Sequence, residues 1–479
     1  MQTVHIKRLD GEGGALKREA IDDLRTRVGE RLITSGDADY GVARRVWNGM
    51  IDRHPALIVR CRGSADVMAS VAFAREHGLL LAVRGGGHNV AGFGTCEGGM
   101  VIDLSAMSGV RVDPKARIVR VGGGATWADV DRETQVHGLA VPGGIVSTTG
   151  VGGLTLGGGQ GWLRRTHGMT CDSLVSVDVV TADGGLVSAS ETENADLFWA
   201  LRGGGGNFGV VTSLEFRAWP VGPMVAFAGP GYALESAPRV MEAVRAFAAD
   251  APDEVNLSTT WWTVPAVPGF PEEIHGRAVI IVGAVYAGPA EEGREVMEPL
   301  RRIEEPVLDL TTVLPYSALQ QMFDPFFPSG SLHYYWKSMY LAGLGEEAVQ
   351  TLAEHVAARP SPLSMVAVWA LGGAFARVEA SATATGARDA PFLLEILANW
   401  EDPNDSDSNI RWARDLFGAM EVHGTGQTNV NFPGLGDDAE FGRAAFGDHW
   451  SRLVAVKRTY DPENLFRLNQ NIDPGGSPE

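Results

Sequence analysis

The sequence predicts an α+β protein with two lobes. A chain of 479 residues exceeds a typical domain of roughly 100–200 residues, so more than one folding unit is expected. Glycine accounts for 61 residues, and its dense runs all fall in the first half of the chain. After Trp219-Pro220 the glycine density falls and the apolar segments become longer and aromatic. We therefore expect a first lobe over 1–220, a second lobe over 221–440 and a C-terminal segment over 441–479.

The first lobe alternates strands, helices and glycine loops. Apolar spacing predicts helices over 64–78 and 126–138. Because glycine allows a ligand to approach the backbone closely, glycine loops between strands indicate main-chain N–H groups around something flat or anionic. A turn-rich β-structure without a ligand is the alternative. The strands of this lobe are predicted at 57–61, 79–84, 100–104, 117–123, 176–184 and 209–216.

The second lobe has the pattern of an antiparallel sheet with helices. Helices are expected over 291–303 and 346–358, between apolar strand-like runs. The C-terminal run 444–466 reads as an amphipathic helix that ends at an Asp-Pro turn, and we expect it to return to the first lobe. The strands of the second lobe are predicted at 278–288, 364–378 and 392–400.

Composition excludes several classes of partner. The chain is 44% hydrophobic and 21% charged, as in ordinary soluble proteins, and its formal charge is −19. No stretch concentrates Lys and Arg, so nucleic acid and anionic membrane surfaces are not expected partners. No secretory signal and no run of roughly 20 apolar residues is evident, and we expect a cytoplasmic protein. Three cysteines without CxxC spacing predict neither a disulfide framework nor a zinc site, and no metal is expected.

One glycine motif is a false match to a dinucleotide-binding fingerprint. The run 204–209 fits G-x-G-x-x-G, but it follows a helical segment and precedes a strand-like one. The fingerprint requires the order strand then helix, so that the phosphates meet a helix N-terminus. The motif therefore does not predict a Rossmann site.

Two nucleophilic side chains lie in glycine-rich surroundings, His88 in VRGGGHNVAGFG and Cys171 in GWLRRTHGMTCDSL. With the segments around them, they give the chain a resemblance to the berberine-bridge-enzyme-like flavoprotein oxidases. The resemblance is continuous over roughly 50–220 and resumes in short runs of the second half. These matching runs lie at 315–320, 334–338, 407–420, 430–432 and 460–472.

The resemblance implies the FAD fold of the vanillyl-alcohol-oxidase or PCMH type, with FAD as the cofactor. In that family the histidine of an RxGGH motif carries the flavin 8α-methyl, which corresponds to His88. The resemblance also places Cys171 where a cysteine carries flavin C6, so a flavin bound at both positions is expected. Two such bonds would fix the ring system and withdraw electron density, making the flavin a stronger oxidant.

The resemblance assigns cofactor contacts to the glycine runs and to the C-terminal tail. Val151 falls where relatives place a residue beside the flavin that controls oxygen access. Asn471 is expected to return to the flavin neighbourhood. The further expected contacts, many of them backbone donors to the pyrophosphate, are Arg84, Gly85, Gly86, Gly87, Asn89, Val90, Gly143, Gly144, Ser147, Thr148, Gly150, Gly152, Gly153, Gly157, Gly161, Gly209, Val210, Val211 and Asn469.

The usual catalytic base of the relatives is missing. They often carry a tyrosine before VNF, and here that position is Asn429, which cannot accept the proton. Tyr335 and Lys337 lie two apart in YYWKS, so they share a strand face, and a nearby lysine would favour the phenolate. Packing in the sheet is the equal alternative. Asn431 is a candidate substrate contact, and His167 is a candidate to deprotonate Cys171 or else a surface histidine.

Two classes of function remain open. The first is an FAD oxidase that transfers hydride from an alcohol, amine, phenolic metabolite or sugar to flavin N5 and passes electrons to O2, giving H2O2. The second is a flavin-bearing protein that sequesters a redox-active metabolite, or a dehydrogenase with another acceptor. The sequence identifies neither the substrate nor the oligomeric state.

Overall fold

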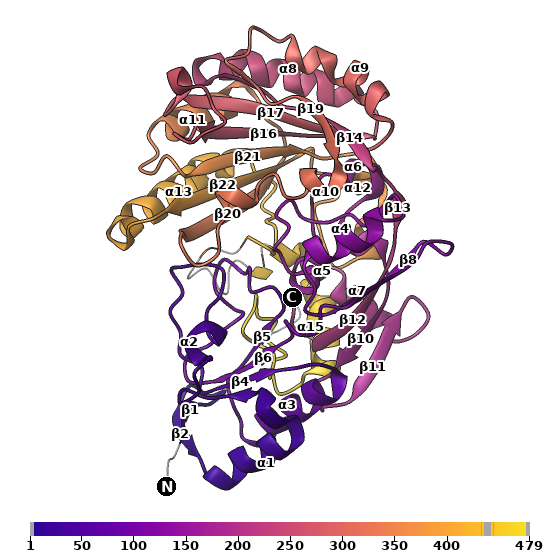
Figure 1. Cartoon of the computed structure of the whole chain (residues 1–479), viewed down its shortest axis with the longest axis vertical. Helices are drawn as coiled ribbons and strands as arrows, with labels where there is room; N and C mark the ends of the chain where they lie inside the picture. The colour runs from indigo at the N-terminus through magenta and orange to yellow at the C-terminus, as the bar shows by residue number, and fades with distance from the viewer. Residues whose placement is uncertain (1–3, 433, 435–441, 444, 476–479) are drawn as a thin grey trace.

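The computed structural model describes residues 4–432, 434, 442–443 and 445–475. Two lobes are stacked along the long axis of the molecule (Figure 1). The predicted boundary at 220 falls between strand β13 (Trp219–Pro220) and strand β14 (Met224–Ala228). The predicted boundary at 440 lies outside the described residues.

Two sheets form most of the first lobe. The smaller contains the parallel pairs β4–β6 and β5–β6 with β3 antiparallel at its edge, and the larger is antiparallel. The strands of the smaller sheet, in spatial order, are β3 (Leu32–Ile33), β4 (Leu57–Arg60), β6 (Met100–Asp103) and β5 (Leu81–Arg84). Those of the larger are β11 (Leu186–Ser190), β10 (Leu174–Val180), β12 (Val210–Arg217), β8 (Ile118–Gly122) and β7 (Val110–Asp113). Outside these sheets, β1 (Val4–Lys7) pairs with β2 (Gly13–Leu16), and β9 (Leu139–Ala140) pairs with β13.

Helix α3 (Ser64–Glu76) joins the two sheets through one hydrophobic cluster. Val67 and Val71 are fully buried there with Val59 of β4 and Val180 of β10. The predicted helix over 64–78 is therefore confirmed. The other helices of this lobe are α1 (Arg18–Val28), α2 (Tyr40–Ala43), α4 (Trp127–Gln135), α5 (Val151–Leu156), α6 (Arg164–His167) and α7 (Ala195–Leu201).

The second lobe is one antiparallel sheet, covered by helices on the face that points away from the first lobe (Figure 1). Its main strand order is β18 (Leu308–Asp309), β15 (Pro230–Ala233), β17 (Ala278–Tyr286), β16 (Val255–Thr263), β21 (Met365–Ala370), β22 (Phe392–Trp400) and β20 (His333–Leu341), with β14 and β19 (Thr312–Pro315) beside it. The covering helices are α8 (Ala237–Asp250), α9 (Ala290–Arg301), α11 (Glu346–Ala357) and α13 (Ser406–Met420). The short helix α10 (Tyr316–Leu319) follows β19.

Alternation along strand β22 separates the two faces of this sheet. Leu394 and Ile396 pack in the cluster under the helices. Leu393 and Leu397 belong to clusters that also contain first-lobe residues. Because side chains alternate along a strand, Glu395 lies on the face toward the first lobe.

The strand predicted over 364–378 is too long. Strand β21 ends at Ala370, and Gly372 and Gly373 follow with φ of 95° and 56°. Such positive φ angles suit glycine and turn the chain away from the sheet. Residues 374–377 then form helix α12 (Ala374–Arg377).

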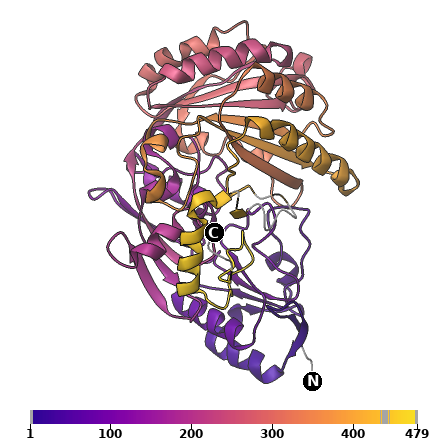
Figure 2. The ribbon, with the colours of Figure 1, turned by 180° about the vertical axis from the view of Figure 1, so that it is seen from behind.

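The C-terminal segment packs on the first lobe. Helix α15 (Trp450–Tyr460) lies beside α7 (Figure 2), where the Arg452 guanidinium is 3.7 Å from the centroid of the Trp199 ring. The Tyr460 hydroxyl donates to Asp196 over 3.1 Å.

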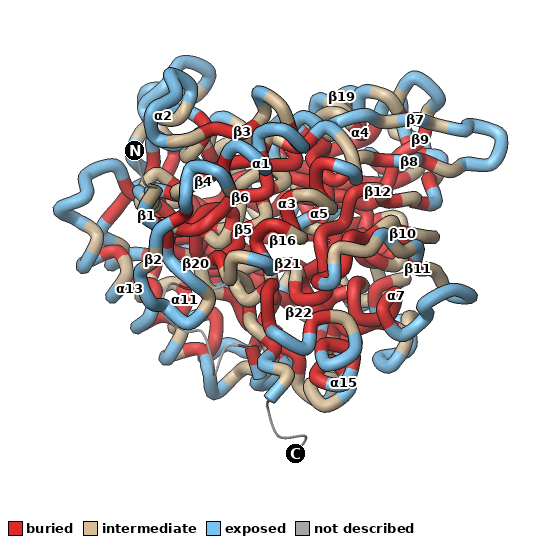
Figure 3. Tube along the Cα trace, turned by 90° about the horizontal axis from the view of Figure 1, so that it is seen from below, coloured by how far each residue is buried: buried red, intermediate tan, exposed pale blue. Residues whose placement is uncertain are grey.

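Buried residues run through the middle of the molecule, and exposed ones lie on loops and outer turns (Figure 3). Within the described ranges, no helix has the length and apolar character needed to cross a membrane. The same residues contain no cluster of three or more His, Cys, Asp or Glu suited to a metal ion.

Candidate active site

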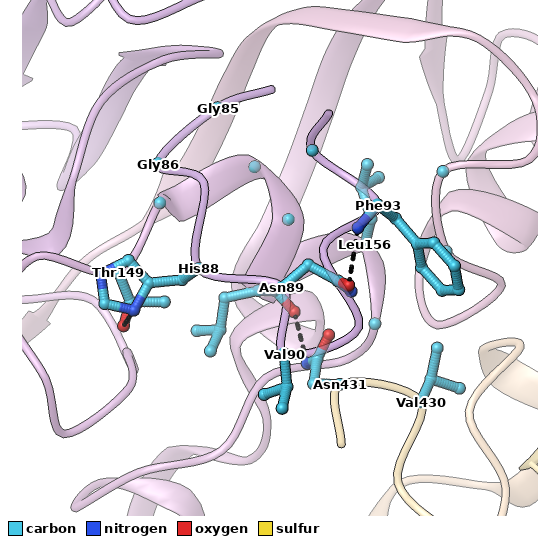
Figure 4. A pocket seen from close by; sticks show the side chains of 18 of the residues that line it. Gly85, Gly86, His88, Asn89, Val90, Phe93, Thr149, Leu156, Val430 and Asn431 are labelled. Carbon is cyan, nitrogen blue, oxygen red and sulfur yellow. Dashed lines mark hydrogen bonds between the residues drawn. The ribbon is translucent and has the colours of Figure 1, made fainter. Parts of the chain in front are cut away.

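A pocket is lined by both lobes, where the glycine loops of the first lobe meet the open face of the second sheet. The first lobe contributes the loop after β5, the segment 144–160 and the loop 205–209. The second lobe contributes side chains of β20, β21 and β22, including Trp336, Trp369 and Glu395. Figure 4 shows His88, Asn89 and Val90 in the same pocket as Val430 and Asn431 from the C-terminal part of the chain.

Most of the residues expected to contact the cofactor lie in the wall of this pocket. Asn431, expected to contact substrate, is also in the wall, and its Nδ2 donates to the Leu154 carbonyl over 3.1 Å. The expected cofactor residues that line the pocket are Arg84, Gly85, Gly86, Gly87, His88, Asn89, Val90, Gly144, Gly150, Gly152, Gly153, Gly157, Gly209, Val211 and Asn469.

Two glycine loops touch each other at Gly86 and Gly150. A Cβ atom on Gly86 would lie 2.4 Å from the Gly150 nitrogen, and one on Gly150 would lie 2.4 Å from the Gly86 nitrogen. No side chain fits at either position without displacing backbone. The glycine spacing in the sequence thus reflects backbone-to-backbone packing as well as an open wall.

His88 is held from several sides. Its Nε2 lies 2.9 Å from the Thr148 hydroxyl, and its Nδ1 lies 3.4 Å from the Thr149 hydroxyl. The Trp47 ring stacks on the imidazole at a centroid distance of 4.9 Å. Burial lowers the pKa of His88 to about 3, so the ring is neutral near pH 7 and retains a nitrogen lone pair.

Arg84 ends strand β5 and pairs with Asp103 at the end of β6. The two residues are partners in the parallel register, and Nη2 of Arg84 lies 2.8 Å from Oδ2 of Asp103. Both side chains are almost fully buried. The positive charge at this wall is therefore already paired, and Arg84 acts mainly to join the two strand ends.

Several expected cofactor contacts lie elsewhere. The Ser147 hydroxyl donates to Asp324 over 2.6 Å, so Ser147 links the two lobes. Val151 is fully buried in the first-lobe core between the wall residues Gly150 and Gly152, and its place beside the flavin stays a prediction. Thr148 contacts His88 from outside the pocket wall. The remaining expected contacts that do not line the pocket are Gly143, Gly161, Val210 and Asn471.

Cys171 is not among the described residues that line the pocket. Its backbone N–H donates to the Gly158 carbonyl over 2.9 Å, and its side chain is fully buried in a hydrophobic cluster with Trp162 and Met169. Burial, with the Asp172 carboxylate 3.7 Å from Sγ, raises the pKa of the thiol. The described pocket wall includes His88 but not Cys171, and flavin attachment at both residues stays a prediction. His167 stacks on Trp219 at 4.4 Å between ring centroids.

The interpretation of Tyr335 and Lys337 as facing the substrate is corrected. Tyr335 is fully buried in the cluster beneath the helices, and its hydroxyl accepts from Nε of Arg414 on α13 over 3.0 Å. Nζ of Lys337 lies 4.4 Å from the centroid of the Phe417 ring on the same helix. The alternate residues Trp336 and Ser338 point toward the first lobe. The residues of β20 that face the pocket are therefore offset by one position from Tyr335 and Lys337, and an offset of one residue places a side chain on the opposite face of the sheet.

Glu395 is the functional candidate that the sequence argument missed. It lies in the pocket wall on β22, and its Oε2 accepts from Nε1 of Trp369 over 2.8 Å. Burial raises the pKa of Glu395 to about 7, while the Trp369 N–H and the Arg164 charge oppose that rise. Glu395 is the one carboxylate among the described residues of the wall. A single charged residue inside the apolar run FLLEILANW is the signal that could have found it.

Comparisons with known proteins bear on this geometry. A family model described as an FAD binding domain matches residues 55–190, and one described as berberine and berberine like matches 427–473. The uncharacterised FAD-linked oxidoreductase YgaK of Bacillus subtilis is 32% identical over 458 residues, covering 94% of this chain and 98% of the relative. The chain belongs to the berberine-bridge-enzyme-like family of FAD-linked oxidoreductases.

Other proteins similar to this chain have names that specify a substrate. The (R)-6-hydroxynicotine oxidase of Paenarthrobacter nicotinovorans is 30% identical over 93% of this chain and 97% of the relative. The crystal structure of 6-hydroxy-D-nicotine oxidase from Arthrobacter nicotinovorans matches with a TM-score of 0.82 at 27% identity, over 93% of this chain and 98% of that one. A chitooligosaccharide oxidase matches with a TM-score of 0.84 at 24% identity, over 95% and 100%, which supports the fold. The expected two-lobed FAD fold is confirmed.

The pocket of this FAD-linked oxidoreductase fits its cofactor. A Cβ on Gly153 or Gly206 would meet no protein atom within 4 Å, so the backbone there faces open space in the pocket wall. Gly85, Gly86 and Gly87 expose further main chain, as a phosphate-bearing ligand requires. The single wall carboxylate, Glu395, belongs to the second lobe. These loops would hold FAD, with His88 within the same wall.

Proposed function

We propose that the enzyme is an oxidase that carries FAD covalently on His88 and uses Glu395 as its proton acceptor. The observation that carries the proposal is that these two residues, from opposite lobes, line one pocket. Bound FAD would accept a hydride from the substrate carbon and pass two electrons to O2, giving H2O2. The substrate would be a small molecule with an O–H or N–H beside that carbon.

His88 has the properties of an attachment residue. Its lowered pKa leaves the imidazole neutral, and a neutral ring nitrogen is the form that forms a bond to carbon. Thr148 and Thr149 contact the two ring nitrogens, and Trp47 stacks on the ring, so its orientation is set before FAD arrives. Thr149 and Trp47 belong to the pocket wall themselves.

We propose attachment through His88 alone, in place of the double attachment expected from the sequence. The thiolate is the reactive form of cysteine, and burial beside Asp172 raises the pKa of Cys171 and disfavours that form. Asp172 forms an ion pair with Arg388 over 2.7 Å, and the Arg388 charge only partly opposes the rise in the pKa of Cys171. Cys171 is thus a packing residue in this proposal.

Glu395 supplies the base that Asn429 cannot provide. A carboxyl with a pKa of about 7 is substantially ionised at neutral pH and still binds a proton strongly enough to act in general-base catalysis. The Oδ1 of Asn429 accepts from the Asn431 backbone N–H over 3.0 Å, so Asn429 shapes the loop at the wall. In this role Oε1 of Glu395 accepts the proton of the substrate O–H or N–H.

The oxidase chemistry is tested by two measurements on the purified holoenzyme. Alcohols and amines are screened for H2O2 release in air, and each active compound is then mixed with the enzyme anaerobically. The proposal expects loss of the oxidised flavin absorbance with the active compounds and its rapid return when O2 is admitted. Flavin that stays reduced in air while a dye accepts its electrons would overturn the oxidase assignment.

A further inference from the structure

The glycine loop 204–209 and the C-terminal tail, residues 465–472, are hydrogen-bonded neighbours in the pocket wall. The loop matches G-x-G-x-x-G without the strand-then-helix order of a Rossmann site, so its glycines need another explanation. The wall residues are Gly205, Gly206 and Gly209 of the loop and Phe466, Leu468, Asn469 and Gln470 of the tail.

Asn207 joins the loop to the tail. Its side chain is fully buried, and its Nδ2 donates to the Gln470 carbonyl over 3.1 Å. Its Oδ1 accepts from the Ile472 backbone N–H over 3.0 Å. In the opposite direction, Nδ2 of Asn469 donates to the Gly206 carbonyl over 3.1 Å. A displacement of either segment would therefore break hydrogen bonds to the other.

A buried lysine contacts both segments. Lys457 lies on α15, and its Nζ donates to the Asn207 carbonyl over 2.7 Å and to the Phe466 carbonyl over 2.9 Å. Its third acceptor is Asp461, whose Oδ2 lies 2.6 Å from Nζ. The Asp461 carboxylate also accepts from the backbone N–H groups of Leu465 and Phe466, each over 2.8 Å. Each of the three N–H bonds of the ammonium thus has an acceptor.

The ion pair of Lys457 and Asp461 is completely shielded from solvent. Both side chains are 0% exposed. Removing two charges from water costs free energy, and a pair of apolar side chains of similar size often stabilises a protein as well or better. Apolar side chains could not form hydrogen bonds to the backbone of the loop and the tail. The specific contribution of the pair is therefore the placement of these two segments.

We propose that Lys457 and Asp461 are positioning residues for FAD, because they fix the loop and the tail in the arrangement that would hold the cofactor. Neither side chain is among the described residues of the pocket wall, so both act through the backbone of the loop and the tail. The inference depends neither on which residue carries the flavin nor on Glu395 as the base. It therefore goes beyond the proposed function.

FAD release tests the proposal in a background where the flavin is not covalently bound. His88→Ala/Cys171→Ala removes both candidate attachment residues, so the result does not depend on which of them carries the flavin. We expect Lys457→Met in this background to release FAD at least about tenfold faster after dilution, because two carbonyls lose a charged donor. The rise in flavin fluorescence as FAD leaves the protein measures the rate.

Arg452→Met is the matched control on the same helix. It also removes a cation from α15, but the lost contact is with the Trp199 ring of α7, and neither residue is among the described wall residues. We expect it to release FAD at the background rate. All variants are compared at a temperature where circular dichroism shows each of them folded, since lower stability alone does not change release from a folded protein.

Asp461→Asn replaces Lys457→Met if that variant does not fold. It keeps the size of the side chain and removes the charge that pairs with Lys457, so we expect faster FAD release from this variant as well.

Hydrogen exchange in the otherwise wild-type holoenzyme provides a second measurement, with His88 and Cys171 in place. Lys457→Met should raise the exchange rate of backbone amides in the loop and the tail at least about tenfold, while the strands of the first lobe keep their protection. The Ile472 amide is the clearest reporter, because its acceptor is the side chain of Asn207.

The proposal is overturned if Lys457→Met releases FAD at the background rate, or if Arg452→Met speeds release as much as Lys457→Met does. If the His88→Ala/Cys171→Ala background holds no FAD, hydrogen exchange decides. Unchanged protection of the loop and the tail then overturns the proposal, and a loss confined to these two segments supports it. None of these outcomes bears on the oxidase chemistry, which H2O2 release tests separately.

Discussion

The indole Nε1 of Trp369 donates to Oε2 of Glu395 over 2.8 Å, between the neighbouring strands β21 and β22. The Arg164 guanidinium lies over the face of the Trp369 ring, 4.5 Å from the ring centroid. The Trp369 N–H and the Arg164 charge lower the pKa of Glu395, and they therefore oppose burial, which raises it. The hydrogen bond fixes one oxygen of Glu395, a residue that lines the pocket.

Replacing Glu395 tests its role as the base. Glu395→Gln keeps the size of the side chain and removes the proton acceptor, so we expect anaerobic flavin reduction to slow by roughly 10²–10⁴-fold. FAD content should not change, because the glycine loops are untouched. Rapid mixing of substrate with the holoenzyme measures the rate, and a rate equal to that of the unmodified enzyme would exclude Glu395 as the base.

The pH dependence of reduction follows from the same carboxyl. The base acts when it is deprotonated, and its pKa is raised to about 7, so the rate should rise with pH through about 7 and be lost below it. Trp369→Phe removes a donor that favours the ionised form. Its rate profile should therefore shift to higher pH, whereas a purely structural role for Trp369 would lower the rate at all pH values alike.

Tyr335→Phe provides the contrasting variant on strand β20. The substitution removes the hydroxyl that accepts from Arg414, on the face covered by α13. We expect a loss of about 0.5–1.5 kcal/mol in the free energy of unfolding and little change in the rate of flavin reduction. A reduction rate that fell as far as in Glu395→Gln would show that the assigned face of β20 is wrong.

Asp131 on α4 predicts a pH-dependent loss of stability outside the site. Its carboxyl is 2% exposed, and neither oxygen has a hydrogen-bond partner among the described residues. Burial raises the pKa of Asp131 from 3.8 to about 7, so the folded state binds this proton more tightly than the unfolded state. The stabilisation that the protonated Asp131 gives the folded state is complete below about pH 4 and is lost as the pH rises through about 7.

Asp131→Asn should therefore melt at a higher temperature than the wild-type enzyme at about pH 8. Its free energy of unfolding should be higher by up to a few kcal/mol. The difference should shrink toward about pH 4, where both side chains are neutral. Thermal unfolding at the two pH values measures it. A lower melting temperature for Asp131→Asn at the higher pH would contradict the account.

The glycine loops, His88 and the two-lobed architecture could be predicted from the sequence because each depends on local constraints. Gly86 and Gly150 must be glycine since their backbones touch, and that requirement is visible in the sequence as clustered glycines. The face of strand β20 could not be predicted, because Tyr334 and Tyr335 are both aromatic and both buried. Long-range packing distinguishes the two faces, because Tyr334 stacks on Trp47 of the first lobe and Tyr335 contacts Arg414 of α13.

Glu395 could not be identified from the sequence, for a related reason. Glu395 lies in a continuous apolar run, where burial on both faces of the strand conceals the alternation that would have marked the pocket side. The surroundings of Cys171 could not be predicted either, because its thiol lies beside Asp172, which is paired with the distant Arg388. Such contacts depend on long-range packing, which local sequence does not record.

Intact mass spectrometry of the denatured protein tests the central claim most directly. The wild-type protein should carry the mass of one FAD after denaturation, and the Cys171→Ala variant should carry it as well. His88→Ala should have the mass of the bare chain, even when it is saturated with FAD before denaturation. Attachment at His88 would be contradicted if the wild-type protein had the mass of the polypeptide without FAD. It would also be contradicted if His88→Ala retained FAD and Cys171→Ala lost it.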